Sequence, residues 1–190
     1  MIFASTNEGK IKEVKKILNI DIKTLNDLDK EIIINETGNS FKENAIIKAK
    51  ETYKITKMPV IAEDSGLEID ALNGFPGINT HRFQEGTDND RNQALLKMMK
   101  DKTNRTCYFT SCFAYYNGKD LITSEYKLKG KIAKRENIKY GFGFDNIFLY
   151  KNKFLSNMTI DEKNAISPRK FALEKLIVDR NFKKNIDFKV

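Results

Sequence analysis

A long run of alternating side chains in the middle of the chain constrains its fold most strongly. Residues 107–116 form two interleaved sets, one from Cys107 to Tyr115 and the other from Tyr108 to Tyr116, which is the period of a β-strand. Asn117-Gly118 follows and precedes a second strand-like run over residues 121–128. An Asn-Gly pair between two such runs is a strong signal of a two-residue hairpin turn. The middle of the chain therefore predicts a β-hairpin.

Strand and helix patterns alternate before this hairpin. Short segments with the composition of buried strands occur at residues 1–4, 32–34, 59–62 and, after the hairpin, 146–150. Apolar side chains recur at helical spacing over residues 10–18 and 41–53. Alternating strands and helices followed by a hairpin predict an α/β fold with a mixed sheet.

Helix start signals mark the second half of the chain. Thr159-Ile160-Asp161-Glu162 has the spacing of a capping box. Ser167-Pro168 places a cap and a first-turn proline ahead of a helical pattern over residues 171–178. Asp88 or Asn89 is expected to cap another helix, with inward side chains at Ala94, Leu95 and Met98.

Composition predicts a single domain spanning residues 1–190. The chain has three prolines, no repeat and no low-complexity segment that would mark a linker. No apolar run approaches the ~18 residues of a membrane span, and the first residues lack the features of a signal peptide. We therefore expect no membrane partner. Cys107 and Cys112 have no CxxC spacing, so we expect reduced thiols and a cytoplasmic location.

The net charge of +8 raises nucleic-acid binding as one interpretation. The lysines are scattered along the chain and interleaved with Asp and Glu, and no cluster of basic and aromatic residues stands out. We therefore expect solvated lysines and no stable nucleic-acid partner. A positive field would also attract a triphosphate.

Three segments carry residues suited to phosphate and metal chemistry. The first, Ser5-Thr6-Asn7-Glu8-Gly9-Lys10, joins a strand to a helix and can present backbone N–H groups, hydroxyls and a lysine to a phosphate. It lacks the GxxxxGK[ST] spacing of a Walker A loop, which argues against a γ-phosphate-cleaving NTPase. An ordinary capped helix start with a solvated lysine remains an alternative.

The second segment is Glu63-Asp64-Ser65-Gly66, directly after the strand expected at 59–62. Two adjacent carboxylates beside a core strand are costly to desolvate unless a cation or donors face them. Their side chains diverge in a strand, so one can bind a metal while the other points elsewhere. Glu36, at the end of the strand expected at 32–34, and Glu43, on the first turn of the next helix, could add oxygen ligands for Mg²⁺. For Glu43 a favourable charge at a helix N-terminus is an equal alternative.

The third segment is Gly141-Phe142-Gly143-Phe144-Asp145. Two glycines around an aromatic residue allow the backbone to approach a flat ligand, and Phe142 could stack on a base. A glycine-flexed turn before the next strand explains the same residues.

Together these segments resemble the inosine-triphosphate pyrophosphatase family, also called the Ham1 or non-standard purine triphosphatase family. The resemblance covers nearly the whole chain through five motifs in order, which are STNEGK, FKENAIIKAK, EDSGLEIDALNGFPGINTHRF, GFGFDNIF and MTIDEKNAISPRKFAL. The EDSG form is closest in style to archaeal-type members. One such motif is weak evidence, but five in register are specific.

The resemblance implies a fold, an activity and a set of site residues. The fold is a long curved mixed β-sheet with flanking helices forming two lobes around a central cleft, in a homodimer. The activity is Mg²⁺-dependent hydrolysis, with Mn²⁺ as an alternative ion, of ITP, dITP and XTP to the monophosphate and pyrophosphate, which keeps deaminated bases out of DNA and RNA. Asp64 is the catalytic proton acceptor and binds the metal with Glu36, supported by Glu43 and Glu63. The substrate-binding residues are Ser5, Thr6, Asn7, Glu8, Gly9, Lys10, Lys48, Ser65, Phe142, Gly143, Phe144, Asp145, Lys163 and Arg169.

The chain departs from the family pattern at three positions. Pro168 stands where the family has the histidine of its ISHR motif, which puts base selectivity in doubt. Asn146 replaces the proline of the YDP motif, and Glu63 replaces the bacterial aspartate. A related nucleotide pyrophosphatase with another base preference, or a basic nucleic-acid-binding module, is the alternative function.

Overall fold

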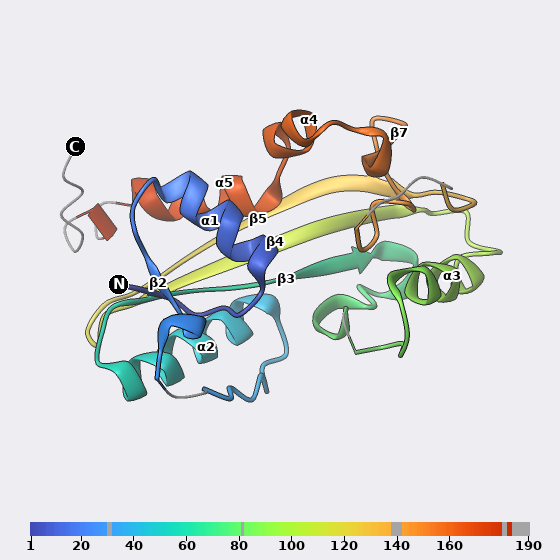
Figure 1. The fold of residues 1–190 in the computed structure, drawn as a ribbon. Coiled ribbons are helices and arrows are strands. Elements are labelled where there is room, and N and C mark those ends of the chain that lie inside the picture. Colours follow the sequence, from blue (N-terminus) through green and yellow to red (C-terminus); the bar gives the residue numbers. More distant parts are fainter. Residues whose placement is uncertain (30–31, 81, 138–141, 180–181, 184–190) are drawn as a thin grey trace. The chain divides into compact units, whose positions relative to one another are not determined.

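The described part of the chain, residues 1–29, 32–80, 82–137, 142–179 and 182–183 of a computed structural model, contains one seven-stranded mixed sheet. In sequence order the strands are β1 (Ile2–Phe3), β2 (Lys23–Thr24), β3 (Val60–Ile69), β4 (Thr106–Tyr116), β5 (Leu121–Ile132), β6 (Phe148–Tyr150) and β7 (Lys153–Phe154). Their order in the sheet is β2-β1-β3-β4-β5-β6-β7. β1 pairs in parallel with β2 and β3, whereas β6 pairs antiparallel with β5 and β7 (Figure 1).

Five α-helices accompany the sheet in the described residues, namely α1 (Glu8–Leu18), α2 (Phe41–Thr56), α3 (Asp88–Met98), α4 (Ile160–Ala165) and α5 (Pro168–Val178). Helices flanking a sheet of mixed strand direction confirm the predicted α/β class. None of the described helices combines the length and apolarity that crossing a bilayer would require.

The hairpin predicted from the alternating run is confirmed. β4 and β5 are neighbours in the sheet and are joined by residues 117–120. The Asn117 carboxamide oxygen accepts the backbone N–H groups of Lys119 at 2.9 Å and Asp120 at 2.7 Å. Gly118 has a φ of +95°, a left-handed value that favours glycine. Asn117 thus organises the turn from its first position, while Gly118 and Lys119 lie at its tip.

The chain divides into two compact units, and strands β3, β4 and β5 each run from one into the other. The first unit comprises Met1–Ser65, Ser111–Tyr126 and Pro168–Val190. Within it α1 and α5 lie on one face of the sheet and α2 on the other (Figure 1). Strand alternation explains this, because Phe3, Ile61 and Phe113 pack with α1 and α5, while Ala4, Val60, Ala62 and Ala114 pack with α2. The small residues on the α2 side admit the close approach of Ala45 and Ala49.

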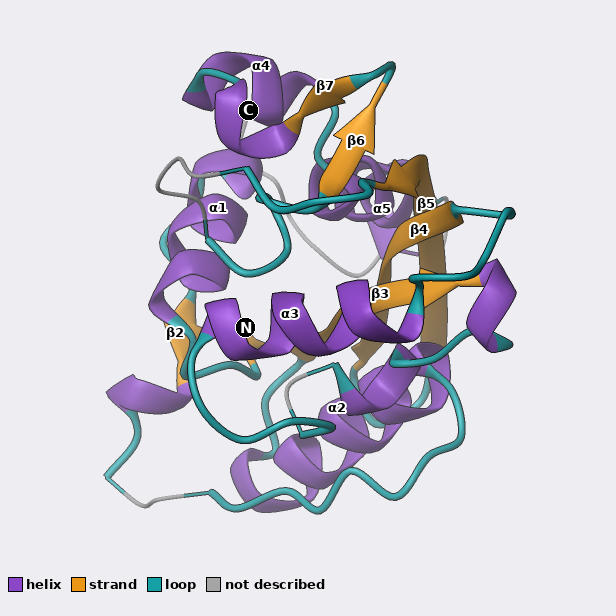
Figure 2. Cartoon of the chain, turned by 90° about the vertical axis from the view of Figure 1, so that its right-hand side faces the viewer, coloured by secondary structure: helices purple, strands orange, loops and turns teal. Residues whose placement is uncertain are grey.

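The second unit comprises Gly66–Thr110 and Lys127–Ser167. It contains α3, the short β6–β7 hairpin and α4 (Figure 2). The capping box predicted at Thr159, at the start of α4, is confirmed. Its core joins Leu67, Leu95, Met99 and Phe148. The expectation that Met98 faces inward is wrong, since its side chain is 45% exposed and Met99 is fully buried. The helix ends at Met98, so the following residue turns into the core.

Two strand expectations need correction. Residues 32–34 form no strand, and the Ile33 side chain is 80% exposed. The place beside β1 is taken by β2, only two residues long, which carries too little pattern to be recognised in the sequence. The strand expected at 59–62 extends to Ile69. Glu63, Asp64 and Ser65 therefore lie inside a strand, and Glu36 lies in an irregular segment rather than at a strand end.

Candidate active site

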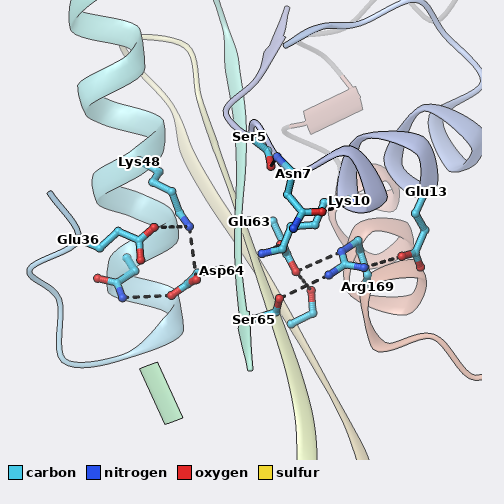
Figure 3. Close-up of polar contacts among 12 residues, drawn as sticks. Ser5, Asn7, Lys10, Glu13, Glu36, Lys48, Glu63, Asp64, Ser65 and Arg169 are labelled. Atoms are coloured by element: carbon cyan, nitrogen blue, oxygen red, sulfur yellow. Dashed lines mark hydrogen bonds and ion pairs between the residues drawn. The ribbon is translucent and has the colours of Figure 1, made fainter. Parts of the chain in front are cut away.

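The adjacent acidic residues Glu63 and Asp64 of strand β3 point to opposite faces of the sheet (Figure 3). Glu63 and Ser65 point toward α1 and α5, and Asp64 points toward α2 (Figure 3). This is the divergence expected from a two-residue strand period. Because β3 lies between β1 and β4, both carboxylates are buried, with Glu63 at 2% and Asp64 at 8% exposure. Each therefore needs a nearby cation or donor.

On the α2 face, one lysine contacts two carboxylates. The Lys48 Nζ lies 3.0 Å from Glu36 Oε1 and 3.3 Å from Asp64 Oδ1 (Figure 3). Lys48 belongs to α2, Asp64 to β3 and Glu36 to the irregular segment before α2. Three segments that are separate in sequence thus place two acids around one positive charge, as the sequence predicted for Asp64 and Glu36.

Asn44 connects the acids of this cluster. Its Nδ2 donates to Asp64 Oδ2 at 3.0 Å, and its Oδ1 accepts the backbone N–H of Gly38 at 2.9 Å. The Asn44 side chain is fully buried. Gly38 packs so closely that a Cβ there would lie 2.7 Å from the Cβ of Glu43. Asn44 therefore ties the segment carrying Glu36 to the carboxylate of Asp64.

The surroundings of Asp64 and Lys48 raise the pKa of both groups. Burial raises the pKa of Asp64 and the neighbouring Glu36 charge adds to this, while Lys48 and Asn44 oppose it. Burial alone would lower the pKa of Lys48, but Asp64 and Glu36 raise it above its usual value. Lys48 is therefore a permanent cation, and Asp64 is a stronger base than an ordinary aspartate.

On the opposite face, Glu63 is surrounded by donors. Its Oε2 lies 2.7 Å from Lys10 Nζ, and its Oε1 lies 3.3 Å from Arg169 Nε. Ser111 Oγ donates to Oε1 at 2.9 Å. Burial would raise the pKa of Glu63, but Arg169 and Lys10 hold it far below its usual range. Glu63 is thus a fixed anion, which makes it an anchor for cations rather than a group that exchanges protons.

Arg169 joins the two helices of this face. Its Nη1 lies 2.5 Å from Glu13 Oε2 on α1, and its Nη2 donates to Ser65 Oγ at 3.5 Å (Figure 3). Pro168 begins α5 as its first residue, which confirms the predicted N1 position. Proline supplies the helix φ without needing an N–H partner there. Helix α5 thus begins at Pro168 without the imidazole that the resemblance led us to expect there.

The segment Ser5–Lys10 is a capped helix start whose lysine is not solvated. Asn7 is the N-cap, with its Oδ1 accepting the Lys10 N–H at 3.0 Å, and its own N–H donates to Ser5 Oγ at 3.2 Å. The exposed residues of the segment are Thr6, Asn7, Glu8 and Gly9. The Lys10 side chain is 16% exposed and bound to Glu63. A hydroxyl, polar backbone and lysine thus cluster at the positive end of α1.

Glu43 has the helix-start role that the sequence left open. Its Oε2 accepts the backbone N–H of Asn39 at 2.6 Å, and its own N–H donates to the N-cap Ser40 at 3.1 Å. These contacts stabilise the first turn of α2. Glu43 thus supports the site by fixing the helix that carries Asn44 and Lys48.

The donor set on the α2 face fits a hard divalent cation. Mg²⁺ is usually held by one or two carboxylates together with substrate phosphates, rather than by a complete protein cage. Among the described residues no three His, Cys, Asp or Glu side chains gather as a cluster. Glu36 and Asp64 instead supply two carboxylates that already converge on one positive charge, so a metal there would displace the Lys48 ammonium.

The remaining predicted residues lie in the second unit. Phe142 is 76% exposed, whereas Phe144 is 6% exposed and packs against Phe109. The Phe144 side chain therefore has a core role, and the expected substrate contact of this residue stays a prediction. Asp145 Oδ2 lies 2.5 Å from Lys163 Nζ, and the Asp145 N–H donates to the Phe142 carbonyl at 3.2 Å. Gly143 has a φ of +58°, and Gly141 lies outside the described residues.

Sequence reasoning missed Asn44, Glu13 and Ser111 as partners of the site. Asn44 lies within the FKENA motif, one residue after Glu43, but its role depends on Gly38 and Asp64. Glu13 lies one helical turn after Lys10, so its face could be inferred, although its partner Arg169 could not.

Comparisons with known proteins agree with this geometry. The family model described as the Ham1 family matches residues 1–179. The chain is 45% identical to the dITP/XTP pyrophosphatase of Borreliella burgdorferi, covering 92% of each chain. It is 41% identical to that of Bacillus subtilis, covering 92% of this chain and 93% of the relative.

A solved structure gives the same result at the level of the fold. The HAM1 protein from Coxiella burnetii superposes with a TM-score of 0.86 at 35% identity, covering 92% of this chain and 94% of that one. These relatives are bacterial, and the archaeal style of the Glu63-Asp64-Ser65-Gly66 motif stays a prediction. The chain therefore belongs to the Ham1 family.

Proposed function

We propose that this protein is a nucleoside-triphosphate pyrophosphatase that hydrolyses ITP, dITP and XTP to the monophosphate and pyrophosphate. The single observation that carries the proposal is the contact of Lys48 with both Asp64 and Glu36 beside strand β3. The printed names of the relatives, dITP/XTP pyrophosphatase, support this substrate class. Removal of these nucleotides keeps deaminated bases out of nucleic acids.

In the proposed reaction a water oxygen bonds to the α-phosphorus and the bond from that phosphorus to the bridging oxygen breaks, releasing pyrophosphate. Asp64 accepts the proton of the attacking water as the general base. Lys48 has a flexible stem and can follow the negative charge that develops on the phosphate. Lys10 and the N–H groups at the start of α1 hold the remaining phosphate oxygens.

Metal dependence is general in this family, and we propose Mg²⁺ for this protein, with Mn²⁺ as a substitute. Glu36 and Asp64 would hold the ion, and bound Mg²⁺ supplies neutralisation of phosphate charge. Glu63 is unsuited to metal binding because both of its oxygens contact cations or Ser111. Its part is to orient Lys10 and Arg169.

For base recognition we propose residues of the GFGFDNIF and MTIDEKNAISPRKFAL motifs. The exposed Phe142 ring can stack on a purine, and the Asp145–Lys163 pair offers an acceptor and a donor to its edge. Ser65 and Arg169 would contact ribose or base. Pro168 cannot donate or accept through a side chain, so selectivity for the 6-keto group rests on these other residues.

The remaining proposals concern the state of the molecule. We place it in the cytoplasm as a homodimer, in which residues 1–190 act as one catalytic domain without a stable nucleic-acid partner. The two cysteines are buried thiols, as expected for a reducing compartment.

Product analysis tests the chemistry directly. With ITP, nucleoside monophosphate and pyrophosphate should appear in equal amounts, and free phosphate should appear only after inorganic pyrophosphatase is added. The products can be separated by anion-exchange chromatography with and without that enzyme. Direct formation of the diphosphate would show cleavage at the γ-phosphate and overturn the proposal.

The Asp64→Asn substitution tests the assigned base. It preserves size while removing charge and basicity, so kcat should fall by ~10²–10⁴-fold or more, since metal binding is weakened as well. Asp101→Asn is the matched control, because Asp101 is exposed and makes none of the contacts described for Asp64, Glu36 and Lys48. Circular dichroism should show the native fold in both variants. Near-native turnover of Asp64→Asn would place the base elsewhere.

A further inference from the structure

Helix α3 contacts the proposed base-binding segment at Gly143, through both the backbone N–H and the backbone carbonyl of that residue. The Gly143 N–H donates to Asp88 Oδ2 at 2.7 Å, and the Gly143 carbonyl accepts from Asn92 Nδ2 at 3.2 Å. Asp88 and Asn92 are four residues apart, so they share one face of the helix. Asn92 is 1% exposed. A backbone segment held at both its N–H and its carbonyl cannot rotate about that residue without breaking a hydrogen bond.

The Asp88 carboxylate is itself fixed in place. Arg91 Nη2 lies 2.7 Å from Asp88 Oδ1, and Arg91 Nη1 donates to the Gly86 carbonyl at 2.9 Å. Thr87 caps the helix in a capping box with Asp90. Arg91 thus fixes the Asp88 carboxylate on the first turn of α3 through contacts that do not include Asp90. An acid that served only the favourable electrostatics of a helix N-terminus would not need these contacts with Arg91 and Gly143.

A second acid extends the same contact. Glu136 Oε1 accepts from Asn92 Nδ2 at 2.9 Å, and its Oε2 accepts from Gln93 Nε2 at 2.6 Å. Asn92 thus joins Glu136 and Gly143, which lie on either side of residues 138–141 in the sequence. These contacts lie within the second unit.

We propose that Asp88 and Asn92 are positioning residues that hold the Gly143 peptide, and through it set the direction of the Phe142 ring and of Asp145, for reading the purine base. The inference rests on the proposed function, because only a nucleotide substrate gives Phe142 and Asp145 a base to read. Phe142 is covalently attached to the held residue and 76% exposed, so the direction of its ring depends mainly on the backbone that carries it. Asp145 is linked back to Phe142 by its N–H.

The kinetic test compares discrimination between ITP and ATP. Asp88→Ala and Asn92→Ala should each raise KM for ITP by roughly 3- to 10-fold, the effect of losing one or two net hydrogen bonds, with little change in kcat. The ratio of kcat/KM for ITP to that for ATP should fall. Asp88→Asn keeps an acceptor oxygen for Gly143 and should retain most of the native ratio. Asp90→Ala is the matched control, since it removes a capping acid from the same turn without contacting Gly143.

A substrate-free test separates this inference from the proposed function. The chain has no tryptophan, so Phe142→Trp introduces a single tryptophan whose fluorescence reports on the segment. Its time-resolved anisotropy should show faster local motion when combined with Asp88→Ala or Asn92→Ala, and unchanged motion with Asp90→Ala or Asp88→Asn. Faster motion supports the inference even if the native protein does not hydrolyse ITP. Unchanged motion in both alanine variants, or equal changes with Asp90→Ala, overturns it, as does an unaltered ITP to ATP ratio.

Discussion

Glu63 and Asp64 are neighbours on one strand, but their pKa values shift in opposite directions because the two side chains face different surroundings. Glu63 faces two cations, which lower its pKa, whereas Asp64 shares one lysine with a second acid and is left with a raised pKa. Pairs of titratable groups pushed apart in this way mark acid–base assignments in enzymes. The structural anion and the proposed base are thus distinguished by environment and not by residue type.

We predict that Glu63→Gln destabilises the fold by about 3–5 kcal/mol at pH 7, the cost of removing one partner from a buried ion pair. Lys10 and Arg169 would then lose their shared anion while remaining mostly buried. The measurement is the free energy of unfolding in urea. Glu51→Gln serves as the control, since Glu51 forms an exposed pair with Lys54 and should cost under about 0.5 kcal/mol.

The same substitution predicts a pH dependence. The folded pKa of Glu63 lies below its unfolded value near 4.5, so its stabilising contribution is complete above that value. It is lost as pH falls below 4.5 toward the folded pKa. The difference in unfolding free energy between the native protein and Glu63→Gln should therefore be constant from pH 8 to 6 and shrink below pH 4.5. A difference that grows with acid would contradict the assigned pairing.

At the scale of elements, helix α2 and the irregular segment before it act together. Lys48 and Asn44 both project from α2 toward Asp64, and Asn44 also holds Gly38. The segment that carries Glu36 has no ladder hydrogen bonds of its own. Its position relative to Asp64 is therefore set by side-chain contacts, among them those of Asn44 with Gly38 and of Lys48 with Glu36.

We predict that Asn44→Ala weakens activity about 10- to 100-fold, the usual effect of removing a group that orients metal ligands. The concentration of Mg²⁺ giving half-maximal activity should rise, because the segment carrying Glu36 would lose its link through Asn44 to Asp64. The matched control is Thr52→Val on the same helix, where the buried hydroxyl makes no hydrogen bond. If both variants lost activity equally without a change in Mg²⁺ dependence, Asn44 would have only a packing role.

Local signals allowed much of the fold to be predicted. The β4–β5 hairpin, the Thr159 capping box and the start of α5 at Pro168 each depend on residues close in sequence. β2 and the absence of a strand at residues 32–34 depend on which segment pairs with β1. That competition is decided by tertiary packing, and short apolar segments such as Ile32–Ile34 do not reveal it.

The sequence indicated which residues belong to the candidate site better than it indicated which of them form ion pairs with one another. The resemblance placed Asp64, Glu36 and Lys48 in one site, and Lys48 contacts both acids. The pairing of Glu63 with Lys10 and Arg169 joins three distant segments, so no spacing could indicate it. Phe144 resembled Phe142 in the motif, but strand and loop geometry place its ring in the core.

At the scale of the whole molecule, 34 basic residues against 26 acidic ones give a net charge of +8. Within the site Lys10, Lys48 and Arg169 each contact carboxylates, so their charges are largely offset there. The excess positive charge comes from lysines elsewhere and acts at a distance. A field of this sign attracts a nucleoside triphosphate and raises its rate of encounter.

We therefore predict that kcat/KM for ITP falls by roughly 10-fold as ionic strength rises from about 0.01 to 0.2 M, because the screening length shrinks from about 30 Å to less than about 8 Å. The kcat at saturating ITP should change much less, since bound substrate depends on local contacts. Stopped-flow or initial-rate measurements at fixed free Mg²⁺ test this. The double substitution Lys102→Glu and Lys119→Glu changes two exposed lysines and lowers the net charge from +8 to +4. It should lower kcat/KM at low salt and flatten the salt dependence, whereas a native salt curve in this variant would mean that only the residues contacting the triphosphate attract it.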